Sequence, residues 1–281
     1  MDELIPTNKE LFLEMVVDKL GSNQLNFAEK QGLIRKSAPS PAPFQAAGVL
    51  LPLFYSSGEF FFRLSKRSHG IPQAGDLSCP GGLLHDRWDM IIRGLITSGV
   101  IPVLRNRAGQ LSRQRDAETF QTLSLFLANA LREAWEEIRL NPFSVYFLGP
   151  LPAYSLQLFQ RIIFPMVGLV PNISRFRPNY EVESLVDIPV AAFSDQENYA
   201  TLIREVDGGL GRRETEPLFM PCLIYHDQTG ADHVLWGATF FIIISFLEIV
   251  FNFELPEWRN KRLVKKTIDA RYLSGKGNSR P

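Results

Sequence analysis

Three glutamates stand close together in segment 132–137 of this 281-residue chain. In a helix, Glu133, Glu136 and Glu137 occupy positions i, i+3 and i+4, which places all three carboxylates on one face. Like charges at this spacing destabilise an isolated helix by roughly 0.2–0.5 kcal/mol per pair. No lysine is interleaved to offset the repulsion, so the face suits a cation, and oxygen ligands favour Mg²⁺ or Mn²⁺. The alternative is an acidic face that is only solvated.

The other side of this segment is apolar and predicts the helix that carries the glutamates. Leu131, Ala134, Trp135 and Ile138 follow helical spacing, so we expect them to face the core. The helix is predicted to run from about residue 117 to about residue 139.

A glycine pair, Gly81-Gly82, follows a predicted strand and lets the backbone turn sharply and approach a ligand closely. Together with the acidic helix, the pair resembles a Nudix box that is split in two. Gly82 followed by residues 132–140 is similar to the family pattern G-x5-E-x7-R-E-U-x-E-E-x-G-U, in which U is aliphatic.

The flanking segments resemble the coenzyme A diphosphatase subfamily of the Nudix hydrolases. Arg67-Ser68 and residues 75–82 are similar to an Arg-Ser pair and a G-Q-x-x-F-P-G-G-like segment of that subfamily. Later similar segments follow in the same order, from about residue 45 to residue 250: 148–152, 164–168, 181–182, 188–190 and 236–239.

Three departures from the family pattern stand out. Arg139 takes the place of the final glycine, a residue that favours the left-handed helix cap. Trp88 takes the place of the first glutamate, although Asp86 and Asp89 keep a D-x-x-D spacing one residue later. Gly82 and Arg132 are 50 positions apart where the pattern needs 14, which leaves an insertion of 36 residues at about 88–123.

The resemblance implies a Nudix fold of the α+β class, with a mixed β-sheet sandwiched between α-helices. It also implies divalent metal ions, Mg²⁺ or Mn²⁺, and a division of roles among the matching residues. The metal ligands would be Glu133, Glu136 and Glu137. The catalytic residues would be Glu133, Glu136 and Arg132, and Arg132 would hold Glu136 in place. The substrate-binding residues would be Arg67, Ser68, Gly81 and Gly82. Asp86 or Asp89 would act through water, and Glu181 or Glu183 would supply a further carboxylate or be solvated.

Composition narrows the class of partner. The chain has 30 acidic and 30 basic residues, so no electrostatic affinity for nucleic acid is expected. Two cysteines cannot form a disulfide framework, and the N-terminus lacks the pattern of a signal peptide, so we expect a cytoplasmic protein. Residues 235–253 are apolar, but Glu248 and Asn252 interrupt them. We therefore predict a strand end and a core helix there, with no membrane span.

The chain is predicted to form one enzyme-sized domain at 44–260. A helical extension with a proline-rich linker precedes it at 1–43, and a polar tail follows at 261–281. Strands are predicted at 46–55, 59–65, 145–151, 161–169 and 221–226, and residues 185–193 are predicted to form a short strand or a turn that leads into a helix.

The insertion divides into two parts. Residues 90–104 are too apolar to remain solvated, so we expect them to pack on the domain or on a partner subunit, which leaves a homodimer open. The second part contains Arg105, Arg107, Arg113 and Arg115, which suit either a lid that grips an anionic substrate or a solvated loop.

The sequence thus predicts a metal-dependent hydrolase of a small-molecule nucleoside-diphosphate substrate, with coenzyme A or a derivative the leading substrate. One alternative is a Nudix hydrolase of a nucleotide sugar or dinucleotide. The other is a non-catalytic Nudix-fold binding or regulatory module.

Overall fold

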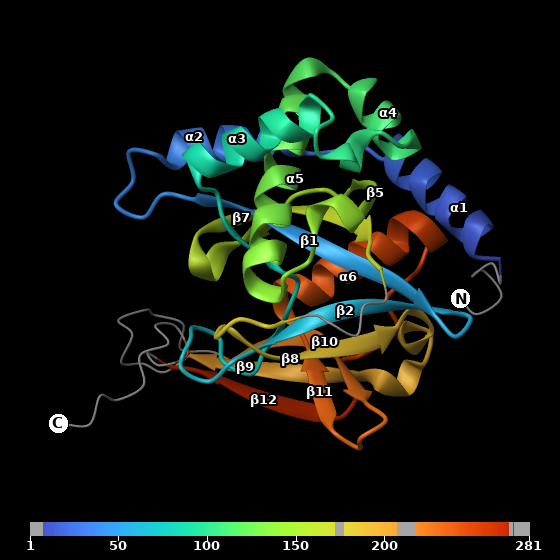
Figure 1. Cartoon of the computed structure of the whole chain (residues 1–281). Helices are drawn as coiled ribbons and strands as arrows, with labels where there is room; N and C mark the ends of the chain where they lie inside the picture. The colour runs from blue at the N-terminus through green and yellow to red at the C-terminus, as the bar shows by residue number, and fades with distance from the viewer. Residues whose placement is uncertain (1–7, 172–176, 207–216, 270–271, 273–281) are drawn as a thin grey trace.

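The computed structural model describes residues 8–171, 177–206, 217–269 and 272, and within them the strands form two sheets (Figure 1). The larger sheet follows the order β3-β2-β1-β7-β5, with β4, β6 and β8 attached at its sides. Its strands are β1 (Gln45–Ser56), β2 (Glu59–Arg67), β3 (Leu77–Ser78), β4 (Gly81–Leu83), β5 (Tyr146–Pro150), β6 (Tyr154–Leu156), β7 (Arg161–Leu169) and β8 (Val182–Pro189). The smaller sheet, β11-β10-β9-β12, comprises β9 (Tyr199–Val206), β10 (Leu218–His226), β11 (Asp232–Leu235) and β12 (Leu263–Ile268).

The larger sheet is mixed because β1 pairs in both senses. It runs parallel to β7 and antiparallel to β2. The β1–β2 hairpin closes through Ser57 and Gly58, whose φ values of 51° and 89° match the left-handed positions of a tight two-residue turn. Both strands of the predicted hairpin are therefore confirmed.

Helices pack on the larger sheet. They are α1 (Lys9–Ser22), α2 (Phe27–Ser37), α3 (Asp86–Thr97), α4 (Arg107–Arg113), α5 (Ala117–Ile138) and α6 (Gly237–Phe251), with short 3-10 turns at Pro102–Leu104, Pro142–Ser144, Gln157–Phe159, Val190–Phe193 and Gln196–Asn198. Phe126 of α5 stacks on Phe164 of β7 at 3.9 Å, and Phe246 of α6 meets Phe62 of β2 edge-on at 5.5 Å. The predicted α+β class, with helices on a mixed sheet, is confirmed.

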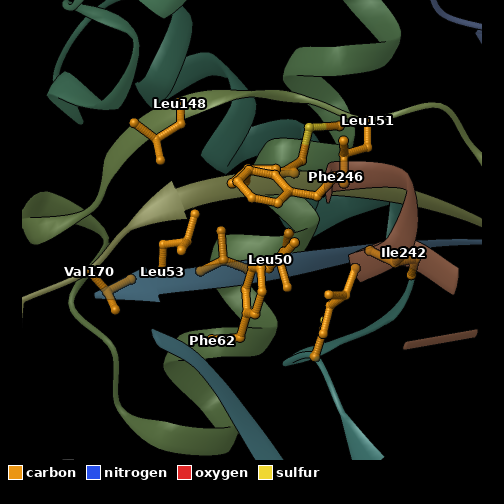
Figure 2. Close-up of a cluster of buried hydrophobic side chains, with 14 of the residues drawn as sticks. Leu50, Leu53, Phe62, Leu148, Leu151, Val170, Ile242 and Phe246 are labelled. Atoms are coloured by element: carbon orange, nitrogen blue, oxygen red, sulfur yellow. The ribbon is translucent and has the colours of Figure 1, made fainter. Parts of the chain in front are cut away.

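The hydrophobic core lies between these helices and the sheet. Figure 2 shows Leu50, Leu53, Phe62, Leu148, Leu151, Val170, Ile242 and Phe246 gathered from β1, β2, β5, α6 and the loops beside them. All of these side chains are buried.

The N-terminal helices belong to the same core. Phe12 of α1 stacks on Phe60 of β2 at 3.8 Å, and Phe27 of α2 meets Phe164 edge-on at 5.1 Å. The segment predicted as an extension at 1–43 thus supplies buried core residues where it is described.

The C-terminal segment differs from the prediction. Residues 263–268, expected to lie in a polar tail, form β12, which runs parallel to β9 with Val264 opposite Leu202. The apolar stretch at 235–253 ends β11 and forms core helix α6, as predicted. No helix in the described ranges has the length and apolar character needed to cross a membrane.

The insertion is helical and packed, so neither a gripping lid nor a solvated loop describes it. It forms α3, a 3-10 turn, α4 and the start of α5, on the side of the molecule away from the smaller sheet (Figure 1). Arg115 donates to the carbonyls of Leu20, Gly21 and Asn23 at 2.8–3.1 Å, at the C-terminal end of α1.

The other arginines of the insertion are also engaged locally. Arg113 donates to the Leu104 carbonyl at 2.8 Å, and Arg107 pairs with Asp18 of α1 at 2.7 Å. A Cβ on Gly99 would lie 3.1 Å from the Arg105 guanidinium. Arg107 and Arg115 thus tie the insertion to α1, and the Arg115 guanidinium satisfies carbonyls at the end of that helix. The contacts of Arg113 and Arg105 lie within the insertion.

Candidate functional site

Helix α5 lies directly on the backbone of β1. The Gly48 amide donates to Asn129 Oδ1 at 2.6 Å, and a Cβ at Gly48 would come within 2.7 Å of the Phe126 carbonyl. Only glycine permits this approach. The contact fixes the C-terminal half of α5, and with it the glutamates, over β4.

The glycine pair of β4 lies against the predicted metal ligands. A Cβ on Gly82 would stand 2.5 Å from Glu133 Oε1, so that carboxylate occupies the space a side chain would fill. The Gly81 amide points to Glu137 Oε1 at 3.5 Å. The sequence predicted a close backbone approach here, and in the structure the groups that approach are the carboxylates.

Arg132 holds the acidic residues together. Its guanidinium lies 2.9 Å from Glu133 Oε1 and 3.0 Å from Glu136 Oε2. It also donates to Asp89 Oδ1 at 2.7 Å and to the Leu83 carbonyl at 3.2 Å. The predicted contact with Glu136 is therefore one of several, and Arg132 fixes two of the three glutamates.

Asp89, one of the two aspartates expected to act through water, bonds directly to protein groups. It is fully buried and accepts hydrogen bonds from the His85 amide at 2.7 Å, from Asn129 Nδ2 at 3.0 Å and from Arg132. Asp86, by contrast, is exposed in the first turn of α3. The one-residue shift of the D-x-x-D pair thus gives a residue that positions Arg132.

Helix α5 ends at Arg139 in the left-handed conformation that glycine usually supplies at a helix C-terminus. Arg139 adopts the left-handed conformation, with φ 56° and ψ 32°, and its amide donates to the Ala134 and Trp135 carbonyls. An L-residue in this conformation costs roughly 1–2 kcal/mol. The Arg139 guanidinium lies 5.7 Å from the centre of the Trp135 ring. Trp135 is 44% exposed, so the prediction that it faces the core is wrong.

The three glutamates differ in burial. The Glu136 side chain is half-exposed, Glu133 is mostly covered and Glu137 is buried. Burial, with the neighbouring Glu133 charge, raises the pKa of Glu137 to about 8. Burial also raises the pKa of Glu133, against the opposing effect of Arg132.

The charge of a fourth carboxylate acts on Glu137 from the segment before β8. Glu181 adds to the rise in the pKa of Glu137. Glu183 instead pairs with Lys66 at 2.7 Å and with His69 at 3.5 Å. Of the two late glutamates proposed from the sequence, Glu181 is the one whose charge affects Glu137.

Arg67 and Ser68 lie beside this carboxylate group. The Arg67 charge opposes the rise in the pKa of Glu137, and its Nε donates to the Pro72 carbonyl at 2.8 Å. The Ser68 hydroxyl donates to the Tyr180 carbonyl, and its amide donates to the Glu181 carbonyl at 2.9 Å. Ser68 therefore anchors the segment that carries Glu181.

A cavity of about 250 Å³ adjoins Arg67. Its walls are mainly apolar and aromatic, with Tyr154, Leu156, Met220 and Trp236 among them. Sites for small molecules have this composition, a hydrophobic wall with a few polar groups.

Sequence reasoning missed a polar network at one wall of this cavity. Asp76 accepts hydrogen bonds from Trp236 Nε1 at 3.2 Å, from Lys266 Nζ at 2.7 Å and from the Tyr272 hydroxyl. Lys266 and Tyr272 come from the segment predicted to be a tail. The only sequence signal was that Asp76 and Trp236 both lie in segments that resemble the subfamily.

The donor set fits a hard divalent cation. Three carboxylates on one helix face supply the oxygen ligands that Mg²⁺ and Mn²⁺ prefer. In the described part of the chain, no three acidic, histidine or cysteine side chains converge on one point, and both Glu133 and Glu136 pair with Arg132. The buried Glu137 carboxylate, whose pKa is raised, is the group that a cation would compensate.

Comparison with known proteins places the chain beside the Nudix hydrolases. It is 35% identical over 100 residues to the uncharacterized Nudix hydrolase NudL of Klebsiella pneumoniae, which covers 35% of this chain and 50% of that protein. It is 39% identical over 89 residues to NudL of Pectobacterium atrosepticum, covering 31% and 45%. The chain spans about half the length of these curated relatives. The similarity supports the Nudix hydrolase family for this chain.

No protein-family model matches the chain, and its similarity to solved structures is low. A MutT/nudix family protein from Enterococcus faecalis is 11% identical with a TM-score of 0.38, over 86% of this chain and 74% of that one. An Ap4A hydrolase from C. elegans is 13% identical with a TM-score of 0.33, over 52% and 80%. Both TM-scores are below 0.5.

Proposed function

We propose that the chain is a metal-dependent hydrolase that cleaves the diphosphate linkage of a nucleoside-diphosphate-linked small molecule. The observation that carries this proposal is the seating of Glu133 and Glu137 against Gly82 and Gly81, with Arg132 clamping the acidic face. A helix face that only meets solvent needs neither a glycine backbone beneath its carboxylates nor a buried aspartate to hold its arginine.

Glu133, Glu136 and Glu137 would hold Mg²⁺ or Mn²⁺. When bound, the ion supplies positive charge against the diphosphate oxygens, whose repulsion otherwise discourages attack by water. Arg132 pairs with both Glu133 and Glu136 and so holds these two carboxylates on one helix face. Glu136, the most exposed of the three, would accept a proton from the attacking water.

The substrate would lie across the glycine pair toward the cavity. Arg67 lies at that side of the carboxylates and can contact a phosphate through its guanidinium. The cavity, with apolar walls and a few polar groups, suits the organic part of such a substrate.

Coenzyme A or a derivative is the leading substrate within this class. The support is the resemblance of Arg67-Ser68 and residues 75–82 to the coenzyme A diphosphatases. Cleavage of coenzyme A at its diphosphate gives 4′-phosphopantetheine and adenosine 3′,5′-bisphosphate.

A substrate screen tests the proposal. The full chain is incubated with coenzyme A, nucleotide sugars and dinucleotides, each with Mg²⁺ or Mn²⁺, and the products are identified by mass. We expect the two coenzyme A products. Much faster turnover of a dinucleotide or nucleotide sugar would overturn the coenzyme A assignment but leave the hydrolase assignment in place. No turnover of any diphosphate would favour the non-catalytic module.

A further inference from the structure

Two arginines lie at the ends of β2 and β7, near the cavity. Arg67 is the last residue of β2 and lines the cavity together with Leu156 of β6. Arg161 is the first residue of β7 and lies directly opposite Leu156. Because opposed residues of paired strands share one face of the sheet, Arg161 lies on the face that Leu156 presents to the cavity.

One atom of the Arg161 side chain is buried without a hydrogen-bond partner. Arg161 Nε is inaccessible to solvent and bonds to no group in the described ranges. A buried polar group that makes no hydrogen bond costs roughly 1–3 kcal/mol, and such groups are rare in native proteins. An unpaired donor beside the cavity indicates a ligand that accepts its hydrogen bond.

The charges point to the chemistry of that ligand. Burial lowers the pKa of Arg161, and the positive charge of Arg67 lowers it further, so the two guanidinium groups are near enough to repel. Within the described residues, neither arginine forms an ion pair with a carboxylate at 4.0 Å or less. An anion between the two guanidinium groups would offset their repulsion and accept a hydrogen bond from Arg161 Nε.

We propose that Arg67 and Arg161 form a phosphate-binding subsite at the edge of the cavity. The two guanidinium groups would donate to phosphoryl oxygens in their planar geometry. This subsite rests on the proposed function, since Arg67 joins it to the carboxylate face through Glu137. The phosphate is either one from the diphosphate itself or a further phosphate elsewhere on the substrate.

Binding by the metal-free chain tests the subsite without turnover. Inorganic pyrophosphate, adenosine 5′-monophosphate and adenosine 3′,5′-bisphosphate are titrated calorimetrically in the presence of a chelator. Arg161→Gln is compared with Arg35→Gln, which removes the same charge from an exposed position on α2. A charge-assisted hydrogen bond contributes enough that its loss should weaken binding roughly tenfold to a hundredfold in Arg161→Gln, with no change in the control.

The unliganded variant distinguishes a ligand role from a structural one. Because Arg161 is desolvated and carries an unmet donor, Arg161→Gln should melt at the same temperature as the wild type or higher. Loss of affinity for the 3′,5′-bisphosphate alone would assign the subsite to a further phosphate, and equal loss for all three probes would assign it to the diphosphate.

Two results would overturn the subsite. One is wild-type affinity of Arg161→Gln for every probe; the other is a lower melting temperature, as for a structural arginine. The hydrolase proposal fails separately: if the wild type binds the probes through Arg161 yet cleaves no diphosphate, only the enzyme assignment falls. If it cleaves coenzyme A and Arg161→Gln does so equally well, only the subsite falls.

Discussion

Glu137 should make the metal-free protein less stable as the pH rises. Its pKa in the folded chain is about 8, against 4.5 for an ordinary glutamate, because the carboxyl is buried and lies beside Glu133. Below pH 4.5 the folded and unfolded chains both hold the proton, so the residue carries no penalty. Between pH 4.5 and 8 only the folded chain holds it, and the free energy of unfolding falls with pH.

The magnitude follows from the two pKa values. Each pKa unit corresponds to about 1.4 kcal/mol, so the penalty is about 3 kcal/mol at pH 7 and about 5 kcal/mol above pH 8. Glu137→Gln has no ionisable group and lacks this penalty. We expect the variant to be more stable than the wild type by about 3 kcal/mol at pH 7 and to match it near pH 4.5.

Urea unfolding from pH 5 to pH 9 in a chelating buffer, followed by tryptophan fluorescence, measures the difference. Glu118→Gln is the matched control, because Glu118 is an exposed glutamate in the first turn of the same helix. A stability difference between Glu137→Gln and the wild type that stays constant over this pH range would refute the assignment of Glu137 as a buried, destabilising carboxyl.

Three further substitutions test the positions of neighbouring groups. Gly82→Ala would place a methyl group 2.5 Å from the Glu133 carboxylate, and should lower turnover about a hundredfold, while Gly94→Ala, with open space around it, should not. Asp89→Asn removes the buried charge partner of Arg132, which keeps its contacts with Glu133 and Glu136, and should lower the unfolding free energy by about 1–3 kcal/mol in urea. Arg115→Gln should lower the unfolding free energy by about 2–4 kcal/mol but leave KM unchanged. A raised KM would instead support the hypothesis that the insertion is a lid that grips the substrate.

The sequence predicted the elements that local patterns determine. Helical spacing located α5 to within a residue or so at each end, and the Ser57-Gly58 turn located the first hairpin. Both depend on residues close together in the chain, which one sequence shows directly. The shared face of the three glutamates followed from the same spacing.

The remaining features depend on contacts between distant segments. Asp89 reaches Arg132 across 43 positions, and Arg115 reaches α1 across more than 90, so neither role could be seen in spacing. Polarity alone suggested a tail at 261–281, yet residues 263–268 alternate between exposed and covered side chains and complete the smaller sheet beside β9. Arg139 shows that a favourable fold can hold an arginine where glycine is preferred.

Turnover of coenzyme A by Glu136→Gln, measured with Mg²⁺ and with Mn²⁺, tests the central claim most directly. The half-exposed Glu136 can lose its charge without unfolding the chain, since the loss also relieves repulsion on the acidic face. We expect the wild type to release 4′-phosphopantetheine and adenosine 3′,5′-bisphosphate, and the variant to lose most of this activity while its melting curve without metal is unchanged or slightly higher. Near-normal turnover by the variant would contradict a metal-dependent site built on these three glutamates.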